Sequence, residues 1–520
     1  MSKSASPKPT AKAGAGRIRR LLIANRGEIA VRIIRACREL GIQTVAIYSD
    51  ADAAAPHARQ ADVAIRIGPP PARESYLDAQ KVIAAAREAQ ADAVHPGYGF
   101  LSERAHFAKA CEDAGLIFVG PPAASLEKMG SKIGARRLMI DAGVPVVPGE
   151  APADQSDAAL AHAAESLGFP VLIKPSAGGG GIGMKKVWAA KDLIEAAAAA
   201  RREAIAAVGD GTLYVERLIE KPRHVEIQIV ADAHGNVVHL FERECSLQRR
   251  HQKTIEESPC AALSPAMRER IGAAAVAAAR AVNYRNAGTV EFLLEGAGDD
   301  ARFYFLEMNT RLQVEHPVTE CVTGIDLVHT QLRIAAGDPL PFTQASLSQR
   351  GHAIECRVYA EDPAQGFIPQ AGPILLYQEP QGPGIRVDSG VGAHSEVSVH
   401  YDPMLAKVIV WAETRDAARR RAIAALQGYA VLGIRTNIPF LLRILDHPNF
   451  IDATIDTGFL DREGAALAAS LKTDLPDAAM AALKEHRRTI GTPGTNPPGT
   501  VGTPGTVGTD PFLSLRNWRG

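Results

Sequence analysis

Two strand-like segments with matched acidic positions set the strongest constraint on how this chain folds. Residues 289–295 and 303–309 are rich in aromatic and aliphatic residues, and the Gly- and Asp-rich turn between them is centred on Asp299. A hairpin with this centre places Glu291 opposite Glu307. Facing carboxylates repel each other and so destabilise a sheet, but a hard cation bound between them turns this repulsion into a net attraction. Mg²⁺ prefers one or two carboxylates plus substrate phosphates. The hairpin therefore predicts the metal floor of a nucleotide-consuming enzyme, with a solvated polar strand face as the alternative.

The second strand leads directly into a dense run of polar residues. Glu307 and Asn309 point the same way, because residues two apart in a strand share a face. Arg311, Glu315 and His316 follow at once. This mixture of charged and amide side chains makes the segment the first candidate for chemistry.

Length and composition indicate a multidomain globular protein. At 520 residues the chain exceeds the usual size of a single core, so about two to four domains are expected. Lys and Arg total 58, as do Asp and Glu, which argues against a nucleic-acid or membrane surface. The six cysteines are scattered without a CxxC pair, which fits a reducing compartment and gives no zinc site. No apolar run reaches about 18 residues, so no transmembrane helix is predicted.

Both ends of the chain differ from its middle. Residues 1–16 are expected to form a disordered tail rather than a transit peptide, because two prolines and two glycines interrupt any amphipathic helix. A cytoplasmic location is therefore expected in preference to the mitochondrial matrix. Residues 461–520 are expected to form a helix and then a flexible tail, because Thr-Pro-Gly-Thr recurs there amid Gly, Thr, Pro and Val.

The region 17–130 alternates strand and helix patterns. Residues 21–24 form a short apolar run, Asn25 is expected to cap a helix over about 29–40, and residues 44–48 resume as strand. A second unit of the same kind follows. This alternation predicts a doubly wound, mostly parallel α/β domain.

A glycine-rich run follows the predicted strand that ends at Lys174. The glycines between 178 and 183 let backbone N–H groups wrap an anion, and Lys174 adds a positive charge. The run lacks the Gly-Lys-Ser/Thr of a Walker A loop and the spacing of a dinucleotide-binding fold. We therefore expect a lid over phosphates, with a plain flexible loop as the alternative.

Three further segments leave two interpretations open. Residues 214–219 could read an adenine through backbone atoms and a glutamate, although a core strand is the simpler interpretation. His224, on the next predicted strand, is by itself expected to be structural. Residues 242–253 are dense in charge, for which a surface run is the default; the alternative is an anion pocket extended by Arg311 and Arg357.

Seven motifs, taken in order, resemble those of the biotin carboxylase component of biotin-dependent carboxylases, an ATP-grasp family. The resemblance covers roughly residues 17–463. The motifs are Ile23–Ala30, His95–Glu103, Met129–Lys132, the glycine run, Pro222–Glu226, Arg249–Lys253 and Glu307–Pro317.

This resemblance implies a mixed α/β and α+β fold in three parts. They are a biotin-carboxylase N-terminal doubly wound α/β domain over 17–130, an ATP-grasp domain over 131–335 with a Gly-rich lid at about 136–210, and a C-terminal α+β domain over 350–460.

The resemblance also implies ligands for residues of this chain. ATP would be surrounded by Lys132, Lys174, Gly180, Gly181, Glu216, Arg217, Leu218, Ile219, His224, Gln248 and His251. Mg²⁺ or Mn²⁺ would be held by Glu291, Glu307 and Asn309. Bicarbonate would be held by Lys253, Arg311, Gln313 and Val314, with Glu315 as its base and Arg357 stabilising the enolate-like oxygen of biotin.

The implied reaction is ATP- and bicarbonate-dependent carboxylation of biotin through carboxyphosphate, the first half-reaction of an acyl-CoA carboxylase. Residues 401–407 and 456–460 look like those of propionyl- and methylcrotonyl-type enzymes. No Ala-Met-Lys-Met biotinylation sequence occurs, so biotin is expected on a separate biotin carboxyl carrier protein. A carboxyltransferase subunit and a homodimer are the other expected partners.

The sequence departs from the family pattern at two places, and it also bears on two alternative functions. Ile182 stands where the family often has a basic residue, and Arg217 and Ile219 replace common Lys and Leu in a strand whose backbone does the reading. Another ATP-grasp ligase, which activates a carboxylate for an amine, is disfavoured by the Arg311–Glu315 pocket and Arg357. A truncated or non-catalytic nucleotide-binding subunit is disfavoured because every expected ligand is present except at Ile182.

Overall fold

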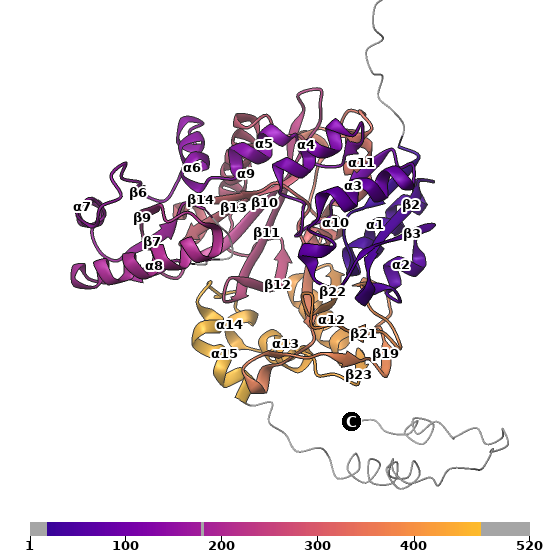
Figure 1. Cartoon of the computed structure of the whole chain (residues 1–520). Coiled ribbons are helices and arrows are strands. Elements are labelled where there is room, and N and C mark those ends of the chain that lie inside the picture. Colours follow the sequence, from indigo (N-terminus) through magenta and orange to yellow (C-terminus); the bar gives the residue numbers. More distant parts are fainter. Residues whose placement is uncertain (1–17, 178–180, 182, 470–520) are drawn as a thin grey trace, which may run out of the picture. The chain divides into compact units, whose positions relative to one another are not determined.

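Five parallel strands with helices on both faces form the N-terminal region of the computed structural model, which describes residues 18–177, 181 and 183–469 (Figure 1). The strand order is β3-β2-β1-β4-β5, and every pairing is parallel. The strands are β1 (Arg20–Ile23), β2 (Gln43–Ser49), β3 (Val63–Gly68), β4 (Ala93–His95) and β5 (Ile117–Phe118). The helices are α1 (Gly27–Glu39), α2 (Pro56–Gln60), α3 (Ala79–Glu88), α4 (Ala105–Asp113) and α5 (Ala123–Met129).

Alternation along β1 explains why helices cover both faces of this sheet. Leu21 and Ile23 pack with Ile33 of α1, whereas Leu22 packs on the other face with Val82 of α3 and with residues of α4. The predicted doubly wound α/β arrangement is therefore confirmed.

Asn25 does not cap α1, contrary to the prediction. The N-cap is Arg26, and no side chain caps the helix. The amide nitrogen of Asn25 instead donates to the carbonyl oxygens of Pro96 (2.8 Å) and Tyr98 (2.7 Å), while its oxygen accepts from the N–H of Arg26. Asn25 thus ties the start of α1 to the loop after β4, and this contact between segments far apart in the chain left no local signal.

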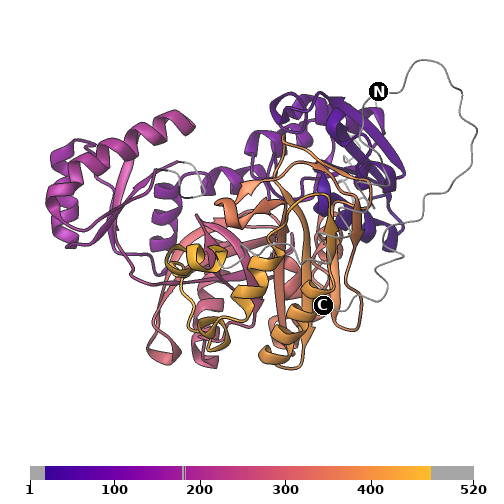
Figure 2. The same cartoon turned by 90° about the horizontal axis from the view of Figure 1, so that it is seen from below.

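A small antiparallel sheet with its own helices makes up the lid. Its strand order is β6-β9-β7-β8. The strands are β6 (Gly149–Glu150), β7 (Val171–Pro175), β8 (Lys185–Val187) and β9 (Leu213–Arg217), and the helices are α7 (Asp157–Leu167) and α8 (Leu193–Val208). The preceding helix α6 (Lys132–Asp141) packs instead on α9 (Pro265–Ala281) and β14 (Arg302–Asn309). Helices α7 and α8 pack on β9 and β7 (Figure 2), and Leu160, Ala197 and Val215 belong to a core separate from the others. The lid is therefore a small folded unit in its own right.

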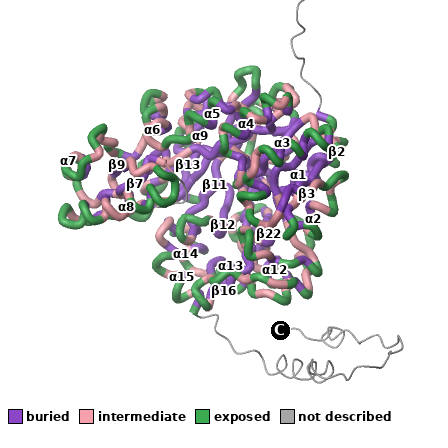
Figure 3. The backbone as a smooth tube through the Cα atoms, in the orientation of Figure 1, coloured by how far each residue is buried: buried purple, intermediate pink, exposed green. Residues whose placement is uncertain are grey.

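An eight-stranded antiparallel sheet forms the centre of the molecule. Its order is β14-β13-β10-β11-β12-β15-β22-β20. The strands are β10 (Arg223–Ala231), β11 (Val237–Arg249), β12 (Gln252–Ser258), β13 (Asn286–Glu295), β14 (Arg302–Asn309), β15 (His352–Tyr359), β20 (Ile385–Ser389) and β22 (Met404–Ala412). The helices packed around it include α9 (Pro265–Ala281), α10 (His316–Thr323), α11 (Leu327–Ala335) and α12 (Arg415–Gln427). Figure 3 shows much of this sheet as buried.

The C-terminal region continues the central sheet instead of forming a sheet of its own beside it. Strand β12 pairs with β15, which joins Ser258 to Ala353 in register, and β22 and β20 follow. The remaining elements are β16 (Glu361–Asp362), β17 (Ile368–Pro369), β18 (Gly372–Pro373), β19 (Leu376–Gln378), β21 (Glu396–Val397), β23 (Ala430–Leu432), α13 (Ile438–Leu445), α14 (Pro448–Ile451) and α15 (Phe459–Ala469). Among the described residues, no helix has the length and apolar character needed to cross a membrane.

Candidate active site

A cleft of about 1240 Å³ contains most of the residues singled out from the sequence. Its lining draws on the loop after β4, the lid, the central sheet, β15 and α15. The singled-out residues that line it are Lys132, Lys174, Gly181, Glu216, Arg217, Leu218, Ile219, His224, Gln248, His251, Lys253, Glu291, Glu307, Asn309, Arg311, Gln313, Val314 and Arg357. Glu315 lies fully buried behind this lining, and Gly180 and Ile182 lie outside the described residues.

Glu291 and Glu307 face each other as predicted, but the turn alone does not give this register, because on the turn side of a bulge Phe292 faces Phe305 and Glu295 faces Arg302. In β13 and β14, Glu291 faces Glu307 and Thr289 faces Asn309, and a register shift follows directly after Glu291. Burial raises the pKa of Glu307, and repulsion from Glu291 raises it further. A cation between the two carboxylates would relieve both costs, so this pair fits a hard divalent ion such as Mg²⁺.

Glu291 is also held by two basic side chains. Nε2 of His224 lies 3.0 Å and Nζ of Lys253 lies 2.9 Å from its carboxylate. Burial by itself raises the pKa of Glu291, but the charges of Lys253 and His224 outweigh burial and lower it below its usual range. Asn309 donates to Glu291 at 2.7 Å, while its oxygen accepts from Arg311 at 3.0 Å. Glu291 is therefore ionised and already held in place.

The lid contributes basic groups on the other side of the cleft. Nζ of Lys174 lies 3.0 Å from the carboxylate of Glu216, which also accepts from Arg136 at 3.0 Å. Burial lowers the pKa of Lys132, although Glu307 raises it in part. Gly181 adopts φ +75°, and a Cβ there would collide with the imidazole of His251. These ammonium groups and the close backbone approach suit a polyphosphate.

The segment predicted to read an adenine lines the cleft from Glu216 to Ile219. Arg217 forms an ion pair with Glu295 (2.9 Å) and donates to the hydroxyl of Tyr304 (2.9 Å). The guanidinium of Arg217 thus bonds to two residues of the hairpin. This arrangement leaves Leu218 and Ile219 as the apolar lining at that end.

Three cations surround a buried carboxylate at the opposite end of the cleft. The carboxylate of Glu315 lies 2.6 Å from Nζ of Lys253 and 3.0 Å from Nη2 of Arg357. Burial raises the pKa of Glu315, but Lys253, Arg357 and Arg243 outweigh burial and lower it well below its usual range. Glu315 is therefore a carboxylate at neutral pH, beside cations that can hold a small anion.

Arg311 is held in place by groups from two regions. Its Nε lies 2.9 Å from Glu103, in the loop after β4, and its Nη1 lies 3.3 Å from the side-chain oxygen of Gln313. Glu103 also accepts from the N–H of Thr310. A carboxylate of the N-terminal region thus orients a cation of the polar run that follows β14.

Residues 242–248 of the charged segment are buried, so the default interpretation as a surface run was wrong for them and fits only the exposed residues 250–252. Arg243 is fully buried and bonds to Glu226 (2.5 Å), which in turn lies 2.5 Å from Nζ of Lys253. Glu256, also buried, lies 2.5 Å from Arg357. The prediction passed over these supporting residues, although His224 and Glu226 alternate on one strand face and so share one environment.

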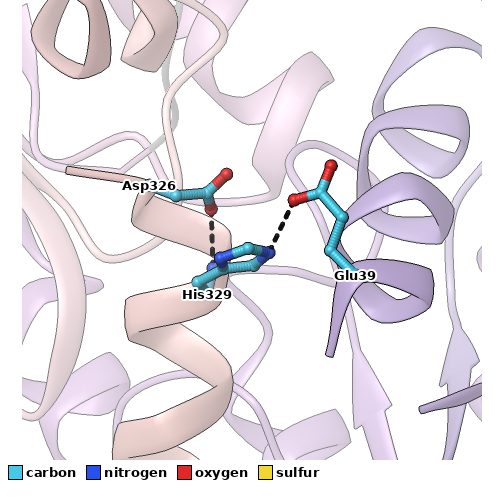
Figure 4. Close-up of side chains that lie close together, drawn as sticks. All are labelled: Glu39, Asp326 and His329. Atoms are coloured by element: carbon cyan, nitrogen blue, oxygen red, sulfur yellow. Dashed lines mark hydrogen bonds and ion pairs between the residues drawn. The ribbon is translucent and has the colours of Figure 1, made fainter. Parts of the chain in front are cut away.

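A second group of histidine and carboxylates lies away from the cleft (Figure 4). Asp326 accepts from the backbone N–H of His329 (2.7 Å) and pairs with Arg32 (2.6 Å). Nε2 of His329 lies 3.1 Å from the exposed Glu39. Because these groups are already one another's partners, the cluster is best explained as a link between α1 and α11.

Three family profiles match consecutive parts of the chain. "Biotin carboxylase, N-terminal domain" matches residues 17–126, "Carbamoyl-phosphate synthase L chain, ATP binding domain" matches residues 131–343, and "Biotin carboxylase C-terminal domain" matches residues 355–462.

Relatives over this length include biotin carboxylase from Halalkalibacterium halodurans, 52% identical over 85% of this chain and 97% of that protein. Methylcrotonoyl-CoA carboxylase subunit alpha from Glycine max is 51% identical over 86% of this chain, but this chain spans only 61% of its length. Among solved structures, the biotin carboxylase domain dimer of Hydrogenobacter thermophilus 2-oxoglutarate carboxylase, in complex with MgADP, ADP and bicarbonate, has a TM-score of 0.83 and 44% identity, covering 87% of this chain and 99% of that one.

Proposed function

Because the chain belongs to the biotin carboxylase family, we propose that it catalyses the ATP- and bicarbonate-dependent carboxylation of biotin. The observation that supports this most is the position of Glu315. It is a buried carboxylate held between Lys253 and Arg357, on the segment that follows the facing pair Glu291 and Glu307. One end of the cleft thus suits a metal-bound polyphosphate and the other suits a small anion with a base beside it.

The first step activates bicarbonate. Lys253 and Arg311 hold the anion, and Glu315, ionised in this setting, accepts its proton. A bicarbonate oxygen then attacks the γ-phosphorus of ATP and ADP leaves, which gives carboxyphosphate. Phosphoryl transfer of this kind depends on in-line positioning and charge neutralisation. Glu291, Glu307 and Asn309 would hold a divalent cation, which would supply part of that neutralisation.

The second step transfers the carboxyl group. Carboxyphosphate breaks into CO₂ and phosphate, and the phosphate takes the proton from N1′ of biotin. The enolate-like oxygen that forms needs a fixed cation, a role that suits Arg357, whose Nε and Nη2 are held by Glu256 and Glu315. N1′ then attacks CO₂. Closure of the glycine-rich lid keeps water from the intermediates.

The proposed acceptor is the biotinyl group of a biotin carboxyl carrier, which then meets a carboxyltransferase subunit. This is supported by the alpha-subunit name of the Glycine max relative. A homodimer is proposed on the likeness to the dimeric Hydrogenobacter thermophilus domain. Sedimentation of the purified protein as a monomer at micromolar concentration would contradict the dimer.

The proposal is tested by measuring ADP release with purified protein, ATP, Mg²⁺ and free biotin. We expect release to require bicarbonate and to fall by about 10²- to 10³-fold in Glu315→Gln. Gln keeps the shape of the side chain but cannot accept the proton. ADP release that ignores bicarbonate and responds to an amine and a carboxylic acid would favour another ATP-grasp ligase. Equal, near-zero rates in both proteins would favour a non-catalytic nucleotide-binding subunit.

A further inference from the structure

Lys407 is a fully buried lysine at the back of the site, outside the set of groups that contact the substrates. It lies on β22 directly opposite Arg357 of β15, and its Nζ donates to the backbone carbonyl oxygen of Val314 at 2.6 Å. Arg357 in turn bonds to the carboxylate of the next residue, Glu315. Two neighbouring cations on adjacent strands thus hold two consecutive residues of the bicarbonate segment.

That segment has no regular secondary structure to hold it. Residues 310–315 lie between the end of β14 and the start of α10, and the carbonyls of Gln313 and Glu315 accept from the backbone N–H groups of His316 (3.4 Å) and Val318 (3.3 Å). The carbonyl of Gln313 accepts from His316, and the carbonyl of Val314 accepts from Lys407. Between the carbonyls of Gln313 and Glu315, which α10 holds, the carbonyl of Val314 is therefore held by a side chain from a distant strand.

The ammonium group of Lys407 is itself held from two further regions. Glu28, in the first turn of α1, lies 3.5 Å from it, and Asp388, opposite Lys407 in β20, lies 4.0 Å from it. Glu28 also accepts from the hydroxyl of Tyr98, and Asp388 is paired with Arg386 at 2.7 Å. A buried ammonium with these partners has little freedom to move, so the carbonyl that it bonds is fixed as well.

We propose that Lys407 is a positioning residue for bicarbonate activation, which rests on the function proposed above. The carbonyl of Val314 belongs to the planar peptide that carries the N–H of Glu315. Holding its oxygen fixes where the Glu315 side chain begins, and Lys253 and Arg357 fix where it ends. Lys407 therefore sets the distance between the base and its substrate without touching either.

The test is the substitution Lys407→Met, which keeps the length of the side chain and removes the donor. We expect kcat/KM for bicarbonate to fall by about 10- to 100-fold, because small misplacements of a reacting group carry penalties of this size. The KM for ATP is expected to stay within about twofold, since the lid and the hairpin do not contact Lys407. Lys407→Arg, which keeps a donor, is expected to recover part of the loss.

Arg32→Met is the matched control for a purely structural role. Arg32 is a buried cation in the adjoining network, paired with Glu320 (2.9 Å) and Asp326 (2.6 Å), and it does not bond to the bicarbonate segment. This variant is expected to lower the melting temperature while leaving the KM for bicarbonate unchanged. Parallel losses in both variants, or an unchanged KM for bicarbonate in Lys407→Met, would overturn the proposal.

Glu28→Gln is the second variant, to be measured if the Lys407→Met protein does not fold. It loosens the hold on the ammonium and leaves the donor in place, so about a threefold rise in the KM for bicarbonate is expected, with the KM for ATP unchanged. No change in the KM for bicarbonate would count against the role of Lys407. A wild-type protein without bicarbonate-dependent ADP release would instead overturn the proposed function.

Discussion

The two sides of the cleft are built in opposite ways. The wall formed by the central sheet has its charges buried and bonded to one another: Lys253 alone lies within 2.9 Å of three carboxylates. The lid is a small sheet with a separate core and with large apolar side chains exposed, among them Trp188 at 59% and Ile205 at 53%. The charged groups of the wall are therefore held in place before substrates bind, and burying them costs stability. The lid contributes mainly backbone groups and a few lysines to the cleft. Bicarbonate chemistry and nucleotide binding should then respond to different substitutions.

Lys253→Met should give the largest effect and damage the wall alone. It leaves Glu226, Glu291 and Glu315 buried without their shared cation, so we expect loss of about 3–5 kcal/mol of unfolding free energy. Bicarbonate-dependent ADP release should fall by at least about 10²-fold. Urea unfolding and a coupled ADP assay measure the two quantities. Lys109→Met, at an exposed position, is the control. Equal losses of stability and activity in both variants would contradict the special role of the buried charges in the wall.

Glu257→Gln should reduce the pH dependence of the free energy of unfolding, through a residue of the wall that takes no part in the reaction. Burial raises the pKa of Glu257, but His352 and Arg415 outweigh burial and lower it to about 2. A depressed folded-state pKa stabilises the protein above the unfolded value near 4.5. That contribution, about 3 kcal/mol, is lost as the pH falls from about 4.5 towards 2.

Unfolding by urea at pH 7 and pH 3 checks this dependence. The wild-type protein should lose more stability between the two pH values than Glu257→Gln does. Asp416→Asn is the control, since Asp416 is exposed and its ion pairs are on the surface. Identical pH dependence in the wild type and Glu257→Gln would contradict the expectation.

Gly181→Ala should affect the lid and spare the wall. The position has φ +75°, and a Cβ would collide with His251, so the loop cannot keep its present position beside His251 at the mouth of the proposed phosphate site. We expect the KM for ATP to rise by about tenfold, with the KM for bicarbonate little changed. Gly209→Ala is a matched control in the same lid, because Gly209 has φ +80° but no atom within 4 Å of the added Cβ. If the KM for ATP rose by a similar factor in Gly209→Ala, the effect would be due to backbone strain and not to the contact with His251.

Lys185→Met should give the smallest effect. Lys185 pairs with Glu203 at 2.6 Å on the lid surface, where both side chains are partly exposed. Ion pairs of this kind contribute at most about 1 kcal/mol, so the melting temperature and both KM values should be nearly unchanged. A clear rise in the KM for ATP would mean that the lid surface takes part in closure.

Local patterns predicted the parts of the site that depend on neighbours in sequence. The predicted pairing of Glu291 with Glu307 is present, although a bulge after Glu291 sets it and the turn alone would place Glu291 one residue out of step; the alternation along β1 determined which helices cover which face. Asn25 failed as a cap because its partners lie about 70 residues away, in the loop after β4. The burial of Arg243 was missed for a similar reason, since its partners Thr289 of β13 and Thr319 of α10 lie far away along the chain.

The pairing of β12 with β15 has a consequence for any attempt to divide this protein. Ending the chain between α11 and β15 would leave β12 with a full row of unsatisfied N–H and C=O groups along one edge, beside a largely apolar sheet. Open edges of this kind recruit other chains, so the isolated 131–335 fragment is expected to form insoluble aggregates. The pairing of β12 with β15 in one continuous sheet thus also protects this strand edge from pairing with other chains.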